Sequence, residues 1–260
     1  MTQPCRACGG PTVPSYTLLS VRHKVEVPTW QCSSCSAYFS DGGPVSYDDV
    51  DLTDYYARNA APIRHRLQRM FDFFEKRVAP GRFIDVGTGM GYSLEVARAR
   101  GWSVAGIEPN ESLVRSALDR GLPVQHGYLG DDGGPEFDLV LVDNVLEHVL
   151  DPAAFLRRVA KLMAPGAELV IAVPPVDWLR RLFGNFEYVR ERVTAPQINV
   201  FAEVDEHVNI MGRRAMHRLL KQVGLTLEPI RFHHSPVFNN AVVRVAGLDD
   251  GYYFARRSPC

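Results

Sequence analysis

Short apolar runs alternate with amphipathic stretches along most of the chain, and this alternation predicts the fold. Residues 83–86 and 137–143 are almost entirely apolar, which is typical of strands buried on both faces. Residues 93–100 follow the first run with helical spacing. Strands that alternate with helices predict an α/β fold, a doubly wound sheet that binds its ligand at the carboxyl ends of the strands. The other elements expected are strands at 102–107, 122–129, 168–173 after a Pro-Gly turn at 165–166, 225–232, and either 241–245 or 252–255, with a helix at 216–223.

A glycine-rich loop joins the first strand to the helix that follows. Its alternate glycines let the backbone turn sharply and leave the N–H groups at the start of the helix facing a ligand. Asp85 ends the strand and can hold a positively charged or amine-bearing ligand, and Glu108 ends the next strand and can accept two hydrogen bonds from a ribose. The sequence therefore predicts a nucleoside-binding crevice. The loop residues assigned to the ligand are Gly87, Thr88, Gly89 and Gly91.

The glycine spacing distinguishes two kinds of nucleoside site. A dinucleotide fingerprint places a small residue three positions after the second glycine, where this chain has Tyr92. The acid followed by Gly-x-Gly-x-Gly instead resembles the first motif of the class I S-adenosylmethionine-dependent methyltransferases, and the resemblance covers roughly residues 55–230. It implies a seven-stranded Rossmann-like methyltransferase sheet, S-adenosylmethionine as the cofactor, and Glu108 as the ligand of the ribose hydroxyls.

The same resemblance implies further contacts with the cofactor. The family sandwiches the adenine at the exit of the third strand, and it often carries an aromatic residue in the helix before the first motif. That aromatic residue would meet the methionine part of the cofactor, although a role in the core is equally open. The residues that this assigns are Pro109, Tyr128, Leu129, Asp143, Asn144 and Tyr56.

Residues 47–79 are predicted to form two helices between the N-terminal segment and the first strand. Their apolar residues recur at helical spacing and are expected to face the core. The basic residues of this segment are expected on a solvated face, and they are Arg64, Arg66, Arg69 and Lys76.

The N-terminus carries a second motif, two Cys-x-x-Cys pairs. Cys5 and Cys8 are separated from Cys32 and Cys35 by 23 residues. Four thiolates on two such knuckles predict a closed tetrahedral zinc site, which would be structural because no coordination position stays open. The alternative is a pair of disulfides in a secreted protein. The polar start of the chain, residues 1–4, disfavours that alternative, and we expect a cytoplasmic protein.

Composition and turn signals suggest the partners and the domain organisation. The 29 basic and 30 acidic residues give a net charge of −1, so no global field attracts nucleic acid or an anionic membrane, and no apolar run is long enough to span one. We expect a small-molecule acceptor as the partner, and the oligomeric state stays open. The domains expected are a zinc ribbon at 1–42, a helical lid at 43–80, and a methyltransferase domain at 81–260 whose insert 174–212 covers the acceptor.

Two histidines are candidates for a general base. His207, with Glu206 beside it, ends the insert, and a similar pair serves in proton abstraction in the deoxysugar C-methyltransferases, which also begin with a four-cysteine zinc domain. This chain lacks the second large C-terminal domain of that family. His148 follows the fourth strand in a Glu-His pair that resembles that of methyltransferases acting on quinone precursors. For both residues, a role in shaping the pocket, capping a helix or packing in the core stays open.

The expected function is methyl transfer from S-adenosylmethionine to a small polar metabolite, such as a sugar, a sugar nucleotide or a secondary-metabolite intermediate in natural product biosynthesis. O-methylation and C-methylation both stay open. An alternative is an RNA base methyltransferase that binds RNA through the ribbon, although residues 1–40 offer few basic side chains and no Asn/Asp-Pro-Pro-aromatic signature follows the fourth strand. A non-catalytic nucleoside binder is disfavoured by the complete glycine loop.

Overall fold

The computed structural model describes residues 3–19, 26–40, 51–131, 136–174, 207–230, 232 and 251–258. Glu206, the greater part of the insert 174–212 and the alternative strand 241–245 lie outside these residues.

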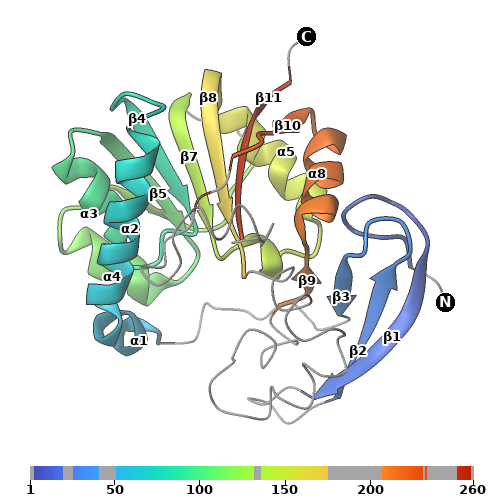
Figure 1. Ribbon diagram of the computed structural model, residues 1–260. Coiled ribbons are helices and arrows are strands. Elements are labelled where there is room, and N and C mark those ends of the chain that lie inside the picture. Colours follow the sequence, from blue (N-terminus) through green and yellow to red (C-terminus); the bar gives the residue numbers. More distant parts are fainter. Residues whose placement is uncertain are drawn as a thin grey trace.

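A seven-stranded sheet forms the centre of the molecule, with strand order β10-β11-β8-β7-β4-β5-β6 (Figure 1). Five neighbouring strands are parallel, and at one edge the reversed strand β11 (Tyr252–Arg257) pairs antiparallel with β8 and with β10 (Leu225–Leu227), so β10 again runs in the direction of the five. This order confirms the expected doubly wound sheet. The five parallel strands are β4 (Arg82–Val86), β5 (Ser103–Glu108), β6 (Val124–His126), β7 (Phe137–Asp143) and β8 (Met163–Ala172).

The central strand β7 shows how the two faces of the sheet form. Leu139 and Leu141 belong to one core cluster, while Val140 and Val142 belong to the other, and all four are fully buried. Successive side chains of a strand point to opposite faces, so an uninterrupted apolar run fills both layers at once. Three helices pack on the first face, namely α2 (Ala60–Phe74), α3 (Tyr92–Ala99) and α4 (Glu111–Leu118), and two on the second, namely α5 (Pro152–Leu162) and α8 (Arg213–Gln222).

A second, four-stranded sheet at the N-terminus contains one strand from a distant part of the chain. Its order is β1-β2-β3-β9, formed by β1 (Thr12–Leu19), β2 (Glu26–Cys32), β3 (Tyr38–Ser40) and β9 (Asn209–Ile210). Figure 1 shows β9 directly below α8 and next to β3. Buried residues of the ribbon, among them Cys5, Cys35 and Phe39, share a core cluster with α5 and α8. The ribbon is therefore packed onto the large domain.

Strand β8 begins earlier than its sequence pattern predicts. The strand was expected to start after a turn at residues 165–166, but it starts at Met163. Phe137 pairs with Met163 and Leu139 with Glu168, so the extra residues between these pairs form a bulge. Gly166 lies in the bulge with φ +81°. The local turn signal was correct, but a bulge within the strand accommodates it.

The prediction that the basic residues of the first two helices lie on a solvated face is wrong for Arg64 and Arg66. Both Arg66 Nη atoms bind the carboxylate of Asp143 at the end of β7, at 3.1 and 2.6 Å, and Arg66 also donates to the Tyr252 hydroxyl. Arg64 binds Glu95 at 2.8 Å and stacks over the Tyr92 ring. Helix α2, which follows α1 (Thr53–Arg58), is thus fixed to the end of β7 and to α3 by charged contacts as well as by apolar packing.

We expect Arg66→Ala to lower the free energy of unfolding by about 3 kcal/mol, because it leaves the carboxylate of Asp143 without its partner in a site only 12% exposed. The exposed Arg115–Glu111 pair provides a matched control, and Arg115→Ala should cost less than about 1 kcal/mol. Urea denaturation measures both variants. Equal small losses would show that Asp143 does not depend on Arg66.

Candidate functional site

The loop between β4 and α3 depends on its glycines. Gly87, Gly89 and Gly91 have φ of +84°, +56° and +78°. A Cβ atom at Gly87 would lie 2.3 Å from Val145 Cγ2, and one at Gly89 would lie 2.9 Å from the Tyr56 hydroxyl. These positions therefore require glycine for both backbone conformation and space.

Glu108, at the tip of β5, braces this loop. Gly89 N donates to Oε2 at 2.8 Å, and Asn110 N donates to Oε1 at 2.9 Å. Burial raises the pKa of the Glu108 carboxyl above its ordinary value, although these two backbone bonds act in the opposite direction. Each carboxylate oxygen keeps a second lone pair, so the expected contact with a ribose diol is compatible with the bracing contacts.

Asp85 is buried at the end of β4 and only partly satisfied. Ser93 Oγ donates to its Oδ2, whereas Oδ1 has no hydrogen-bond partner in the described part of the chain. Burial raises the pKa of Asp85 to about 7, and the nearby carboxylates of Asp143 and Glu108 act in the same direction. A buried carboxylate with one unsatisfied oxygen suits a cationic or amine-bearing ligand. Ser93 escaped the sequence analysis, because a serine in the first turn of a helix is also an ordinary capping residue.

The remaining expected cofactor residues lie around this loop. Tyr56 is partly buried and lies against Gly89, and the loss of solvation raises the pKa of its hydroxyl. The Pro109 carbonyl lies 2.9 Å from His126 Nε2. Tyr128 is 67% exposed and Leu129 is buried, so the two expected adenine contacts have different environments. Their roles stay predictions.

Asp143 ends β7 at the same edge of the sheet, and Asn144 follows it. Asn144 has φ +54°, and its Nδ2 donates to Asp143 Oδ1 at 3.0 Å. Arg66 binds both oxygens of Asp143, a contact that the sequence analysis missed because no local signal distinguishes Arg66 from the other arginines of α2. If Asp143 contacts the cofactor as expected, it must do so while both of its carboxylate oxygens are bound to Arg66.

The structure brings the two candidate bases together. The rings of His148 and His207 lie 4.8 Å apart and meet edge to face. His148 ends the short helical turn η1 (Leu146–His148) just after β7, whereas a single residue, Val208, separates His207 from β9. Two residues far apart in the sequence thus form one cluster, which the sequence analysis treated as two rival sites.

Glu147 completes this cluster. Its carboxylate oxygens have no hydrogen-bond partner among the described residues, and Oε1 lies 3.9 Å from His148 Nε2. Burial raises the pKa of Glu147 to about 8, with a smaller contribution from Asp143. A neutral carboxyl and two imidazoles can hold and exchange a proton near neutral pH. Their ligand atoms lie within 4.8 Å of one another, and such a donor set also suits a divalent cation.

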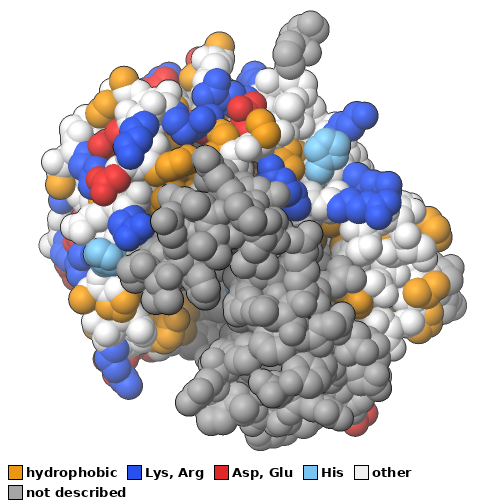
Figure 2. Space-filling view, in the orientation of Figure 1, with side chains coloured by type: hydrophobic (Ala, Val, Ile, Leu, Met, Phe, Trp, Pro, Cys, Tyr) orange, Lys and Arg blue, Asp and Glu red, His pale blue; other side chains and the backbone are white. Residues whose placement is uncertain are grey.

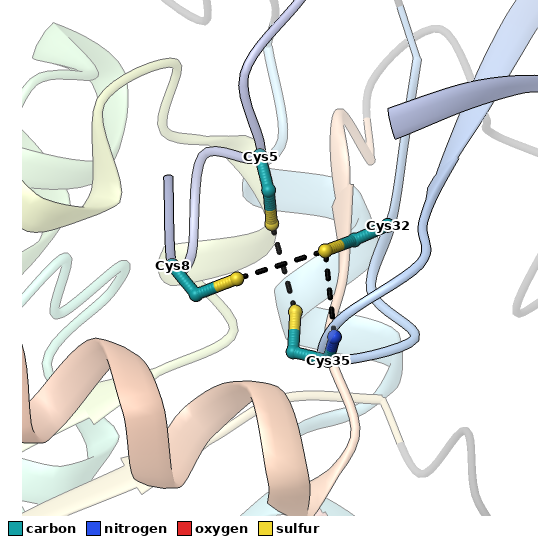
Figure 3. Close-up of side chains that lie close together, drawn as sticks. All are labelled: Cys5, Cys8, Cys32 and Cys35. Atoms are coloured by element: carbon teal, nitrogen blue, oxygen red, sulfur yellow. Dashed lines mark hydrogen bonds between the residues drawn. The ribbon is translucent and has the colours of Figure 1, made fainter. Parts of the chain in front are cut away.

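The four ribbon cysteines converge on one point, with their sulfur atoms facing one another (Figure 3). Cys5 Sγ lies 3.6 Å from Cys35 Sγ, and Cys8 Sγ lies 3.6 Å from Cys32 Sγ. Four sulfurs about 2.3 Å from one ion lie about 3.8 Å apart at the corners of a tetrahedron, so the spacing fits zinc and not a disulfide. The backbone N–H groups of Ser34 and Cys35 point at Cys32 Sγ, which suits a thiolate. The residues therefore fit the expected metal.

The glycine loop, the two strand-end carboxylates and the sheet order together identify the family. Residues 55–230 match the model of the family described as a methyltransferase domain, and the chain belongs to this family. The chain therefore contains a methyltransferase domain. No helix in the described ranges is both long enough and apolar enough to cross a membrane.

Curated relatives match part of this region. The chain is 36% identical over 103 residues to a ubiquinone biosynthesis O-methyltransferase of Caulobacter sp. (strain K31), covering 35% of this chain and 40% of the relative. It is 27% identical over 171 residues to the enzyme of that name from Aeromonas salmonicida (strain A449), covering 61% and 68%. The match spans from 39% to 55% of the length of the Caulobacter relatives and that of Hahella chejuensis.

Solved structures share the fold. The plantazolicin methyltransferase BpumL in complex with SAH superposes with a TM-score of 0.56 at 12% identity, covering 80% of this chain and 88% of that one. An S-adenosylmethionine-dependent methyltransferase from Clostridium acetobutylicum gives 0.55 at 9% identity, covering 80% and 98%.

We expect Gly87→Ala to weaken S-adenosylmethionine binding by about tenfold or more, because the new methyl group must displace either Val145 or the loop. Gly101→Ala is the matched control. Gly101 has φ +89° but no neighbour within 4 Å of a Cβ atom, so it should lose only about 1 kcal/mol of stability and no cofactor affinity. Isothermal titration and urea denaturation measure the two effects. Equal affinities in the two variants would contradict the steric argument.

The pKa of about 7 for Asp85 predicts a pH dependence of cofactor binding. Below that pH the carboxyl is protonated and must lose its proton before it can attract a cation, so affinity should fall by up to about tenfold per pH unit as the pH drops below 7. Asp85→Asn should remove this part of the dependence. Measuring cofactor affinity of the wild-type protein and of Asp85→Asn at about pH 6 and about pH 8 tests this. Protonation of the ligand's own amine affects both proteins equally, so it cancels in the comparison. Parallel pH profiles would exclude Asp85 as the titrating group.

Proposed function

We propose that this protein methylates a hydroxyl group of a small-molecule acceptor, with the histidine cluster next to the donor loop serving as the general base. The observation that carries this proposal is the 4.8 Å separation of the His148 and His207 rings, with Glu147 beside them. The cluster follows β7, and Val145 of the same segment lies against Gly87 of the donor loop. An acceptor bound at the cluster would therefore lie near the methyl donor.

The bound cofactor supplies an electrophilic methyl group, and the protein must align the acceptor with it. A hydroxyl also has to lose a proton, which one of the two imidazoles can accept. Glu147, neutral at pH 7 by its pKa of about 8, can supply or accept a proton at the adjacent imidazole. The expected contribution of Glu206 remains part of the proposal, with His207 as its neighbour in the chain.

The acidity of the acceptor narrows its class. A phenol has a pKa of about 10, as tyrosine does, whereas an alcohol is closer to water at about 15.7. An imidazole with a pKa near neutrality is better matched to the phenol. The names of the curated relatives, ubiquinone biosynthesis O-methyltransferases, support methyl transfer to an oxygen atom. We therefore place a phenolic acceptor ahead of a sugar hydroxyl and ahead of C-methylation.

An acceptor panel tests this order directly. We would incubate the purified protein and S-adenosylmethionine with an ortho-diphenol, a free deoxysugar, a sugar nucleotide and a short RNA, and measure S-adenosylhomocysteine formation. The position of the new methyl group is then read by NMR. Methylation of a phenolic oxygen supports the proposal. Methylation of a sugar, a carbon atom or RNA alone would overturn it.

With the acceptor in hand, His207→Ala and His148→Ala separate the two imidazoles. Replacing the imidazole that accepts the proton should lower kcat by about a hundredfold or more and leave the affinity for S-adenosylmethionine unchanged. His217→Ala, at an exposed position on α8, is the control and should leave kcat unchanged. If neither active-site variant changes kcat, the cluster has no part in the chemistry.

We also infer that the four-cysteine cluster holds a structural zinc ion. A hydrogen bond from Cys5 lowers the pKa of the Cys35 thiol, which favours the thiolate that a metal ion requires. With four sulfur ligands the ion would have no open position, and it would contribute to folding and not to the reaction.

The basic surface of helix α8 supports a second candidate function, RNA methylation. Its surface side chains are mostly basic, and Figure 2 shows Lys, Arg and His side chains gathered over this helix, next to the ribbon. The positions concerned are Arg213, Arg214, His217, Arg218 and Lys221. RNA binding that weakens steeply with added salt would favour this candidate, whereas salt-independent diphenol methylation favours the first.

A further inference from the structure

The segment after His207 belongs to two parts of the molecule at once. Its residues Asn209 and Ile210 form β9 and pair with Phe39 and Tyr38 of the ribbon. The Val208 carbonyl accepts from Ser40 N at 3.2 Å and from Arg6 Nη1 at 3.0 Å. The backbone that carries one candidate base is thus held as the edge strand of the N-terminal ribbon.

The side chain of Asn209 extends this connection to the second histidine. Its Nδ2 donates to the Leu146 carbonyl at 3.3 Å and to the Val149 carbonyl at 2.5 Å. These two carbonyls lie on either side of the Glu147–His148 pair. Asn209 is 3% exposed and Val208 is fully buried, so water cannot readily replace these contacts.

The other end of the connection is the cysteine cluster. Arg6 lies between Cys5 and Cys8 in the first knuckle, and its guanidinium stacks over the Phe39 ring. The turn after Cys32 is closed by Cys32 N donating to the Ala37 carbonyl at 2.8 Å, and β3 begins immediately afterwards. The place of β3, and hence of β9, therefore follows from how the four cysteines are held together.

We propose that the four-cysteine ribbon is a positioning part of the acceptor site, and that Asn209 is the positioning residue that fixes His148 and His207 relative to each other. This inference rests on the proposed function for the role of the histidines. Loss of the metal would displace β3 and β9, and with them the histidine pair, while the donor loop between β4 and α3 keeps its own contacts with Glu108.

Two variants separate this role from a general effect on folding. Asn209→Leu removes both donated bonds but keeps a side chain of similar size, and Arg6→Ala removes the bond to Val208 without touching a cysteine. Arg98→Ala is the matched control, because Arg98 also donates to a backbone carbonyl, that of Gly121 at 2.8 Å, on the opposite side of the large sheet from α8. Arg6→Lys should restore part of the lost contact.

The first readout needs no acceptor. NMR of protein labelled at histidine gives the imidazole shifts and pKa values of His148 and His207, while zinc content and S-adenosylmethionine affinity are measured on the same samples. We expect both histidines to shift in Asn209→Leu, in Arg6→Ala and after removal of zinc with a chelator. Arg98→Ala should match the wild-type protein, and cofactor affinity should stay within about threefold of wild type in all variants.

The second readout is turnover. With the acceptor identified, Asn209→Leu and Arg6→Ala should lower kcat by about tenfold to a hundredfold with little change in cofactor affinity, since a displacement of about 1 Å can cost that much. Unchanged histidine signals in both zinc-containing variants would overturn the inference, even if zinc removal unfolds the chain. Failure to bind S-adenosylmethionine, or a phenol panel without product, would instead count against the proposed function.

Discussion

Four carboxyl groups at the carboxyl edge of the parallel sheet, three buried and one partly buried, set the electrostatics on which the active end of the molecule depends. Asp85, Glu108 and Asp143 lie within the last two residues of a strand, and Glu147 lies in the turn η1 that follows β7. Three are held by neighbours: Asp85 by Ser93, Glu108 by backbone N–H groups, and Asp143 by Arg66. Glu147 has no such bond in the described structure. Burial, with a smaller contribution from the neighbouring carboxylate of Asp143, raises the pKa of Asp85 and of Glu147.

These clustered carboxyl groups suit a positively charged ligand. A sulfonium ligand brings a positive charge to the edge, where it would relieve the repulsion that burial imposes on Asp85. Of the four carboxyl groups, Glu147 lies beside His148. Under the proposed function, donor binding and proton transfer would therefore both depend on this group of acids.

The sequence predicted those elements that local patterns encode. Apolar runs located β4, β5 and β7 to within a residue or two, and the alternate glycines located the donor loop, since a positive φ and a close approach both require glycine there. Contacts between distant segments left no such pattern. The pairing of Phe39 with Asn209, and the capture of Asp143 by Arg66, depend on the folded chain, so an arginine of α2 looked like any surface arginine.

The folded structure also changes how the two candidate histidines are interpreted. His148 and His207 were separate candidates because the sequence shows each beside its own glutamate, Glu147 and Glu206. The structure places the two rings in contact. The useful unit is therefore the pair and the buried carboxyl beside it, which no inspection of either motif alone would assemble.

The pairing of β3 with β9 has a consequence for synthesis of the chain. Phe39 and Asn209 are 209 − 39 = 170 residues apart, so the N-terminal sheet lacks its last strand until these further residues have left the ribosome. Until then β3 presents an open edge of unpaired backbone groups to the cell, the kind of edge that invites pairing with another chain. Early metal capture by the knuckles would keep this edge short and ordered while the larger sheet assembles.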